Sequence, residues 1–139
     1  MNVLVKNEPK RTLAPDLLKR FTAIVGEKYA ITDPQMQQPY LVEMRDLFRG
    51  QTPVILRPGS VAEVAAIVKL ANETKTAIVP QGGNTGLVGG QISHHGEIIL
   101  SLNRLDKIRE VDATSNTITA EAGVSLGRVR QAAADVDRL

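Results

Sequence analysis

The 139-residue sequence contains no cysteine and no tryptophan, and it has only two phenylalanines and two tyrosines. Without cysteine there can be no disulfides, thiolate metal sites or cysteine nucleophiles, and this composition is compatible with a cytoplasmic location. The scarcity of aromatic side chains argues against a surface on which nucleic acid bases would stack. The sequence therefore excludes redox-active thiols, and it argues against binding of RNA or single-stranded DNA.

Strong charge and long apolar runs are also absent. The net charge is +2 and the basic residues are dispersed, so no nucleic acid partner is expected. No apolar run approaches membrane-spanning length, and the first eleven residues lack the apolar core of a secretory signal. Those eleven residues are polar and are expected to form a mobile terminus. The length suits one domain with its own core.

Residues 80–91, with the sequence PQGGNTGLVGGQ, are the most unusual part of the chain because five of them are glycine. Apolar runs over residues 77–79 and 97–101 flank them and predict two strands joined by this loop. Glycine is costly to order, so a ligand is expected to offset the cost. Left-handed glycine conformations would let successive amides converge on an anion such as phosphate. No charged residue occurs from Pro80 to Ser93, which leaves main-chain amides, Asn84 and Thr85 to hold it.

Two better-known phosphate loops are excluded by the spacing of these residues. The Walker pattern requires a Gly-Lys-Ser/Thr ending, and the loop has no lysine. The dinucleotide fingerprint requires a Gly-x-Gly step, which the glycines at 82, 83, 86, 89 and 90 never supply. The alternative is a flexible surface loop or a hairpin connector without a ligand.

No metal centre or catalytic residue is predicted. His94 and His95 are adjacent in a loop, where neighbouring side chains usually diverge, and we interpret them as surface residues. The His-Glu-x-x-His spacing of helical zinc sites is missing, and no pairing of a nucleophile with a base can be recognised.

Before the loop, cap residues and apolar spacing predict helices and one strand. A helix is expected over residues 15–25, and Asp33 is expected to cap a short segment. The four-residue spacing of Met36, Tyr40 and Met44 indicates core packing. Arg45 and Arg49 are interpreted as solvated surface charge. Residues 52–58 read as a strand bounded by prolines.

A capping box, Ser60 and Glu63, predicts the start of the next helix. The face expected to pack on a sheet consists of Val61, Val64, Ala65, Val68 and Ala71. Together with the strand before the glycine loop, this gives a strand–helix–strand unit, which is normally parallel with a right-handed crossover.

After the loop, residues 107–111 and 117–121 alternate in polarity around a turn-rich segment and predict a hairpin. Ser125 is expected to cap a last helix. Its inward side chains are expected to be Leu126, Val129, Ala132 and Ala133.

Residues 80–90 resemble the pyrophosphate loop of the FAD-linked oxidases and dehydrogenases related to p-cresol methylhydroxylase and vanillyl-alcohol oxidase. Further matches occur, in the order of the family, at residues 32–34, 54–58, 97–102 and 121–124. The resemblance covers about residues 30–139 and points to the branch of D-lactate, glycolate and D-2-hydroxyglutarate dehydrogenases.

This resemblance implies an α+β fold, the first subdomain of an FAD-binding domain of the p-cresol methylhydroxylase (PCMH) type. A small mixed sheet of three or four strands is expected, with helices packed on one face. Residues 1–50 would form an N-terminal helical extension, and residues 51–139 the N-terminal, incomplete part of the FAD-binding domain. The chain would be an N-terminal piece of a larger enzyme.

The resemblance also implies cofactor-binding residues, which are carried over one by one. Gly82, Gly83, Asn84, Thr85, Gly86 and Leu87 would surround the pyrophosphate, Pro80 and Gln81 would lead into the loop, and Gly90 would close it. Ser101 and Leu102 would border the flavin or pyrophosphate, and Gly123 would allow close approach of the adenosine half. Asn84 stands where flavin-tethering members carry a histidine, so FAD is expected to bind non-covalently.

The implied activity is that of an FAD-dependent oxidoreductase that oxidises a D-2-hydroxy acid to a 2-oxo acid and passes electrons to an acceptor. The family's substrate-binding and metal-binding residues lie in its later half, so no catalytic residue is assigned here, and this segment alone is expected to bind FAD weakly or not at all. A homodimer stays open. The alternatives are a non-catalytic module that binds FAD or another phosphate ligand, and a UDP-sugar-binding, reductase-like domain of the same superfamily.

Overall fold

The computed structural model describes residues 12–138, so the expectation for residues 1–11 lies outside it. The N-terminal elements are α1 (Pro15–Val25), the short 3-10 helix η1 (Glu27–Tyr29), β1 (Ala30–Ile31), α2 (Pro34–Leu41), β2 (Ile55–Leu56) and α3 (Val61–Thr74). The remaining elements are β3 (Ile78–Gln81), β4 (Ile98–Ser101), β5 (Ile108–Asp112), β6 (Thr117–Ala120) and α4 (Leu126–Ala134).

Four strands form one mixed sheet in the order β1-β2-β4-β3. Strand β4 pairs in parallel with both neighbours, with Ile99 opposite Ile55 on one side and Val79 on the other. Strand β1 is antiparallel to β2. The expected α+β class and small mixed sheet are confirmed. Because β2, β4 and β3 run in one direction, their carboxyl ends meet at the same edge.

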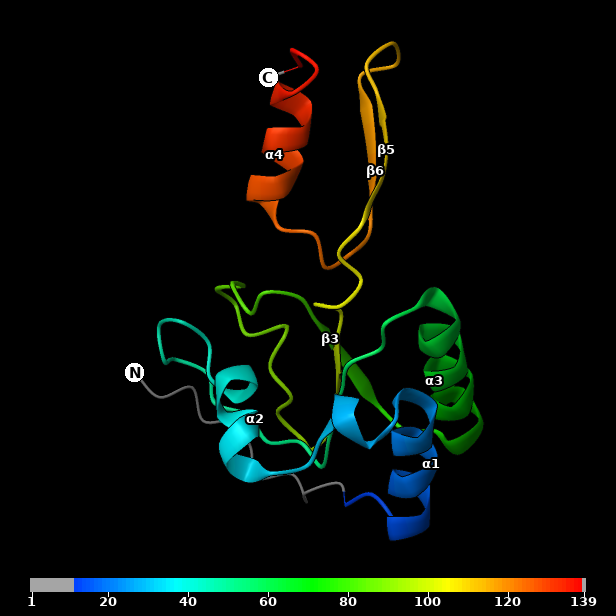
Figure 1. Cartoon of the computed structure of the whole chain (residues 1–139). Helices are drawn as coiled ribbons and strands as arrows, with labels where there is room; N and C mark the ends of the chain where they lie inside the picture. Colours follow the sequence, from blue (N-terminus) through cyan, green and yellow to red (C-terminus); the bar gives the residue numbers. More distant parts are fainter. Residues whose placement is uncertain (1–11, 139) are drawn as a thin grey trace.

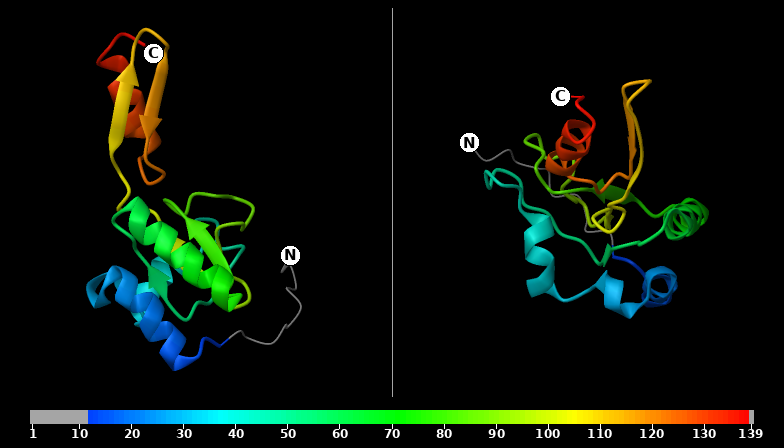
Figure 2. Two further views of the ribbon diagram at one scale, coloured as in Figure 1. Left: turned by 90° about the vertical axis from the view of Figure 1, so that its right-hand side faces the viewer. Right: turned by 45° about the horizontal axis from the view of Figure 1, so that its top comes forward.

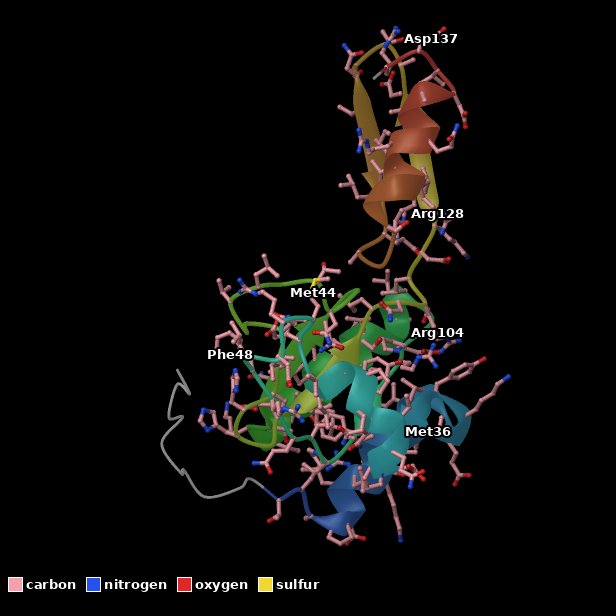
Figure 3. The ribbon with its side chains drawn as sticks, turned by 90° about the vertical axis from the view of Figure 1, so that its left-hand side faces the viewer. Met36, Met44, Phe48, Arg104, Arg128 and Asp137 are labelled. Carbon is pink, nitrogen blue, oxygen red and sulfur yellow. The ribbon has the colours of Figure 1, made fainter. Side chains whose placement is uncertain are left out.

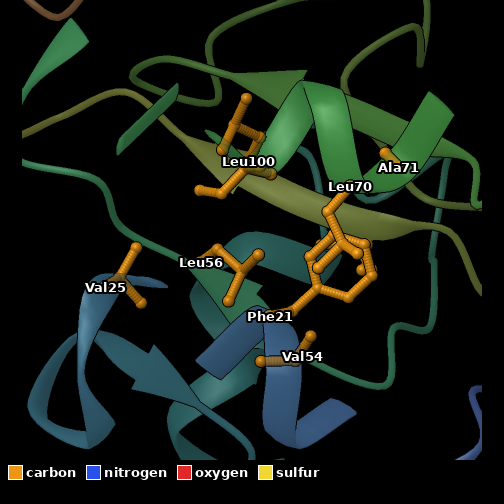
Figure 4. Close-up of a cluster of buried hydrophobic side chains, with 9 residues drawn as sticks. Phe21, Val25, Val54, Leu56, Leu70, Ala71 and Leu100 are labelled. Carbon is orange, nitrogen blue, oxygen red and sulfur yellow. The ribbon is translucent and has the colours of Figure 1, made fainter. Parts of the chain in front are cut away.

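The larger core lies between the sheet and helices α1 and α3 (Figure 4). Phe21 of α1, Leu56 of β2 and Ile67 of α3 are each fully buried there. Burying a side chain such as Phe21 contributes about 3 kcal/mol relative to leaving it in water. Two helices therefore cover one face of the sheet, as expected.

The short helix α2 packs against the opposite face. Its N-cap is Asp33, as expected, whose side chain accepts hydrogen bonds from the N–H groups of Gln35 at 2.7 Å and Met36 at 3.2 Å. Leu41 at its end joins the second core cluster with Ile31, Ile55 and Ile99. This helix matters for function because its C-terminal carbonyls lie beside the glycine loop.

Helix α3 begins at the expected capping box but turns a different face to the sheet. The Ser60 hydroxyl accepts the N–H of Glu63 at 3.2 Å, and the Glu63 carboxylate accepts the N–H of Gly59 at 2.8 Å. The buried side chains are Ile67, Leu70 and Ala71, and Val64 is partly buried against the same core, so Val64 and Ala71 of the predicted face do pack as expected. Val61 and Val68 of that face are 57% and 50% exposed. The helix carries two apolar stripes, and the stripe with the larger Ile and Leu side chains removes more area from water.

The methionine prediction was also wrong, since Met36 and Met44 are 62% and 73% exposed (Figure 3). Tyr40, the third residue of that prediction, does pack against the core, together with Leu41, and Met44 lies in a turn beyond the helix. Spacing alone could not locate the end of α2 and therefore extended its pattern too far.

The hairpin β5–β6 and helix α4 project together from the four-stranded sheet (Figures 1 and 2). The hairpin is antiparallel as expected, and Ser125 caps α4 by accepting the N–H of Arg128 at 3.4 Å. Leu126 was expected to point inward but is 71% exposed. An ion pair of 2.9 Å between Arg128 and Asp106 fastens α4 to the segment that enters the hairpin.

Candidate functional site

The glycine loop, defined here as residues 82–91, begins where strand β3 ends. The strand continues two residues further than the sequence indicated and includes Pro80 and Gln81. Its last residue lies opposite Ser101, the last residue of β4. The loop thus starts at the carboxyl edge of three parallel strands, the position where open sheets with parallel strands usually bind ligands.

The main-chain N–H groups of the glycine loop have no partners within the protein. Across residues 12–138, none of the N–H groups of residues 82–91 donates a hydrogen bond to another protein group. Main-chain donors are strong hydrogen-bonding groups and must be satisfied by water or by a ligand. A row of such donors is suited to binding an anion.

The side chain of Asn84 anchors the start of the loop. Its Nδ2 donates to the carbonyls of Pro39 at 3.0 Å and Val42 at 2.8 Å, and its Oδ1 accepts from Nε2 of Gln91 at 3.2 Å. The residue has a φ of 55°, in the left-handed region that asparagine tolerates better than most residues. Asn84 therefore has a structural task in addition to any contact with a ligand.

Gln81 anchors the base of the loop from inside the protein. It is only 2% exposed, and its Nε2 donates to the carbonyls of Tyr40 at 2.9 Å and Gln91 at 3.0 Å. Its Oε1 is buried without a hydrogen-bond partner, and so is the hydroxyl of the fully buried Ser101. Two orphaned polar atoms therefore lie beneath the glycine loop.

A turn between α2 and β2, residues 42–49, supports the loop from the side, and sequence reasoning did not find it. Arg45 donates a hydrogen bond from Nη2 to the carbonyl of Leu87, so it is more than solvated surface charge. The ring of Phe48 lies against Gly89, where an added Cβ would come within 2.8 Å of the ring and where φ is 78°. No sequence motif marks carbonyl or aromatic supports of this kind.

The buried carboxylate of Glu43 shapes this turn. The side chain accepts the N–H groups of Arg45 at 2.8 Å and Leu47 at 2.7 Å, and the residue is only 1% exposed. The hydrogen bond from the Arg45 N–H is the main cause of a lowered pKa for Glu43; burial opposes the shift and the Leu47 N–H adds to it. Glu43 is thus held ionised inside the turn.

Three glycines of the loop have no reason within the protein to be glycine. Nothing lies within 4 Å of a Cβ added at Gly82 or Gly90, and at Gly83 only the methyl group of Thr85 is near, at 3.8 Å. None of the three has a positive φ, so the expected left-handed conformation applies to Gly89 alone among the loop glycines. Their lack of side chains leaves open space beside the free amides, which suits close approach of a ligand.

The remaining predicted residues lie next to this loop. Thr85, Gly86 and Leu87 are exposed within it, and the carbonyl of Gly86 accepts from Nε2 of Gln91 at 2.7 Å. Leu102 donates its N–H to the carbonyl of Gln81 at 2.9 Å. A Cβ on Gly123 would come within 2.1 Å of the Leu102 carbonyl oxygen. The structure thus brings the predicted residues into one connected region, and for Gly123 packing within the protein is reason enough for a glycine.

The two histidines contribute to packing around the loop. His94 is half-buried with its ring edge toward Phe48, at 6.1 Å between centroids, and its Nε2 lies 3.2 Å from the carbonyl oxygen of Gly89. The hydroxyl of Ser93 donates toward the carbonyl of Gln51 at 2.6 Å. Within residues 12–138 there is no group of three or more His, Cys, Asp or Glu side chains that could hold a metal ion.

A mixed sheet whose carboxyl edge carries a loop of free amides is suited to binding a phosphate-containing cofactor. Residues 52–138, more than half of the chain, match the family described as FAD binding domain, and the chain belongs to this family. This match confirms the FAD-linked family indicated by the sequence, whose defining cofactor is FAD, and the similarity to D-2-hydroxyglutarate dehydrogenases supports the branch.

Relatives and solved structures agree with this assignment. The chain is 42% identical over 138 residues to a D-2-hydroxyglutarate–pyruvate transhydrogenase of Saccharomyces cerevisiae, covering 97% of this chain and 28% of that protein. It is 35% identical over 121 residues to a probable mitochondrial D-2-hydroxyglutarate dehydrogenase of Oryza sativa subsp. indica, covering 87% and 22%. Crystalline p-cresol methylhydroxylase superposes with a TM-score of 0.74 at 22% identity, covering 88% of this chain and 25% of that one.

The chain thus spans about a quarter of the length of these proteins. Its residues fit FAD, because the glycine loop offers free amides and open space beside Gly82, Gly83 and Gly90. Within residues 12–138 no helix has the length and apolar character needed to cross a membrane.

Proposed function

We propose that this chain supplies the pyrophosphate-binding loop of a flavin-dependent dehydrogenase that oxidises a D-2-hydroxy acid to a 2-oxo acid. The observation that carries the proposal is the set of unpartnered N–H groups over residues 82–91. The names of the relatives from yeast and rice, which act on D-2-hydroxyglutarate, support the substrate class. An electron acceptor completes the reaction.

The proposed contacts with the cofactor follow from the position of each residue. Residues 82–87 and Gly90 would present main-chain donors and open space to the two phosphates, with the side chain of Thr85 exposed beside them. Pro80, Gln81, Ser101 and Leu102 would form the floor at the strand ends, and Gly123 would lie where the adenosine half approaches.

FAD, when bound, supplies the two-electron acceptor for the alcohol carbon of the substrate. The residues of this chain bind and orient it. Non-covalent attachment is part of the proposal, since an amide nitrogen such as that of Asn84 is not a nucleophile and is already engaged with Pro39 and Val42. No residue of this chain is assigned a catalytic role.

Organisation, compartment and assembly are also proposals. Residues 1–50 are proposed to form an N-terminal extension with a function separate from that of residues 51–139. In the structure, α1 and β1 of this extension share the core and the sheet with later elements. The cytoplasm stays the predicted compartment on the absence of cysteine, while the rice relative is named mitochondrial. A homodimer stays a prediction.

The test is a titration of the full-length dehydrogenase to which this chain is proposed to belong, here called the native protein, stripped of flavin, with FAD, ADP and a UDP-sugar. We expect FAD to bind tightly, ADP to bind more weakly and the UDP-sugar not to bind. Steady-state assays with a dye acceptor should then show turnover of D-2-hydroxyglutarate or D-lactate but not of the L-enantiomers. Preference for the UDP-sugar would replace the proposal with the reductase-like alternative. Tight FAD binding without turnover of any 2-hydroxy acid would favour the non-catalytic module.

A further inference from the structure

We propose that Arg45 is a positioning residue for the glycine loop, and that residues 42–49 and 82–91 act as one unit in cofactor binding. The inference rests on the proposed function of the loop as the pyrophosphate site. It concerns a part of the chain that carries no recognisable motif.

The turn over residues 42–49 is built to hold Arg45 in place. A bridge between Val42 and Arg49 and a hydrogen bond of 3.3 Å from the Glu43 N–H to the Phe48 carbonyl close its base. The buried Glu43 carboxylate then fixes the main chain of Arg45 and Leu47 through their N–H groups. A buried carboxylate is costly unless it is fully hydrogen-bonded, so this turn has one strongly preferred shape.

From this turn, Arg45 reaches across to the tip of the glycine loop and donates to the carbonyl of Leu87. Within residues 12–138 no other arginine, lysine or carboxylate is hydrogen-bonded to residues 82–91. Asn84 anchors the start of the loop and Gln81 its base. Arg45 tethers the middle of the loop, next to the Gly86 carbonyl that Gln91 holds.

Because of peptide geometry, the hydrogen bond from Arg45 also fixes the direction of a main-chain N–H donor in the loop. In a trans peptide the C=O of one residue and the N–H of the next point in opposite directions. Because Arg45 holds the Leu87 carbonyl, the N–H of Val88 points away from Arg45. Gln91 holds the Gly86 carbonyl at 2.7 Å, so the N–H of Leu87 points away from the Gln91 side chain. Two successive amides are therefore preoriented, and the bound guanidinium also polarises one of the peptides.

Pre-orientation reduces the entropy that the loop must lose when it binds its ligand. Loss of Arg45 leaves the Leu87–Val88 peptide free to rotate, so that a carbonyl oxygen can face the phosphates. Arg49 offers a matched control, because its contribution to the turn is the main-chain bridge to Val42, which a change of side chain retains. Its exposed side chain pairs with Asp46 at 2.6 Å and, within residues 12–138, makes no hydrogen bond to the loop.

The experiment compares the native protein with Arg45→Met, Arg45→Lys and Arg49→Met. For each, the dissociation constants of FAD and ADP are measured together with the unfolding temperature of the flavin-free form. We expect Arg45→Met to weaken FAD and ADP binding by the same factor, about ten-fold for one charge-assisted hydrogen bond. Arg45→Lys, which retains a donor, should recover part of the loss. Arg49→Met should bind like the native protein, and unfolding temperatures should be unchanged because both arginines are exposed.

Salt dependence separates positioning from direct contact with the phosphates. A positioning residue lowers affinity at every ionic strength by the same factor, whereas a direct ion pair to phosphate is screened by salt. Equal affinities of Arg45→Met and the native protein, or a loss that disappears at high salt, would overturn the inference. If the native protein itself binds neither FAD nor ADP, the proposed function fails, and this result is distinct from either outcome for Arg45.

Discussion

Gln81 and Ser101 lie opposite each other at the ends of β3 and β4, and each carries a buried side-chain oxygen without a hydrogen-bond partner in the protein. In-register residues of paired strands point to the same face of the sheet, so both side chains lie on the face covered by α2. The Nε2 of Gln81 is used to hold the loop, which leaves its Oε1 as an acceptor only. Two buried oxygen atoms beneath the glycine loop thus lack hydrogen-bond partners within residues 12–138.

This relationship predicts that Ser101→Ala does not destabilise the flavin-free protein. A buried hydroxyl without a partner costs desolvation and returns nothing, so its removal should raise the free energy of unfolding by about 1 kcal/mol. Chemical denaturation of the native and variant proteins measures the difference. A loss of stability would mean that a bound water satisfies the hydroxyl in the flavin-free protein. A fall in FAD affinity of the same variant would show instead that the cofactor contacts the hydroxyl.

Ser93→Ala is the matched control for this measurement. Ser93 is as fully buried as Ser101, but its hydroxyl lies 2.6 Å from the Gln51 carbonyl oxygen and 2.9 Å from the Glu97 carboxylate. Removing it takes the hydroxyl donor away from the Gln51 carbonyl and from Oε2 of Glu97, which keeps the His95 N–H as a donor, and this loss should cost about 2 kcal/mol. Opposite signs for the two alanine variants are expected.

Gly82→Ala and Gly83→Ala should separate folding from cofactor binding. Both sites have room for a methyl group and neither has a positive φ, so the flavin-free fold should be unchanged or slightly more stable, by up to about 1 kcal/mol. The added methyl group occupies space beside the free amides, so FAD affinity should fall about ten-fold or more. Flavin fluorescence titration and thermal unfolding give the two readouts. Undiminished FAD binding in both variants would remove the loop from the cofactor site.

Gly123→Ala should behave in the opposite way. Its Cβ would lie 2.1 Å from the Leu102 carbonyl oxygen and 2.8 Å from that of Leu105, both main-chain atoms that cannot move independently. We expect a loss of about 3 kcal/mol in the free energy of unfolding, typical of severe overpacking. Any loss of FAD affinity should be no greater than the destabilisation explains. Unchanged stability with a large loss of FAD affinity would restore the interpretation of Gly123 as an adenosine contact.

The sequence was sufficient for those features that local chemistry determines. The cap residues Asp33, Ser60 and Ser125 begin helices in the structure as predicted, and the alternation on both sides of residues 112–116 gave the hairpin. The glycine loop was found because its composition is extreme and because it resembles a known family.

What the sequence could not provide was the support of that loop. The side chains of Asn84 and Gln81 donate to the main-chain carbonyls of Pro39, Val42 and Tyr40. Every residue has a main-chain carbonyl, so the sequence does not indicate which ones act as acceptors. Arg45 is one of many dispersed basic residues, and only the fold brings it to Leu87, 42 positions away. In α3 the period admitted two apolar stripes, and only packing against the sheet decided between them.

The carboxylate of Glu43 predicts an acid-sensitive turn. Hydrogen bonds from the N–H groups of Arg45 and Leu47 hold its pKa in the folded protein below the usual value of 4.5. The proton is therefore bound more weakly in the folded state than in the unfolded state. The stabilisation is fully present above the unfolded pKa and is lost as the pH falls through the lower, folded pKa. Glu97 also has a lowered pKa, because hydrogen bonds led by that from the His95 N–H outweigh the opposing effect of its burial, so it adds a parallel acid sensitivity.

Glu43→Gln isolates the contribution of the turn from that of Glu97. In the native protein with FAD bound to the loop amides, hydrogen exchange of residues 42–49 and 82–91 should accelerate together as the pH falls below 4.5, beyond the intrinsic pH dependence of exchange. In Glu43→Gln both segments should already exchange faster at pH 7, because a neutral amide accepts these N–H groups less strongly than a carboxylate does. FAD affinity at pH 7 should fall with them, since the turn positions the loop. Protection in 42–49 that is lost without any change in 82–91 would show that the two segments are not coupled.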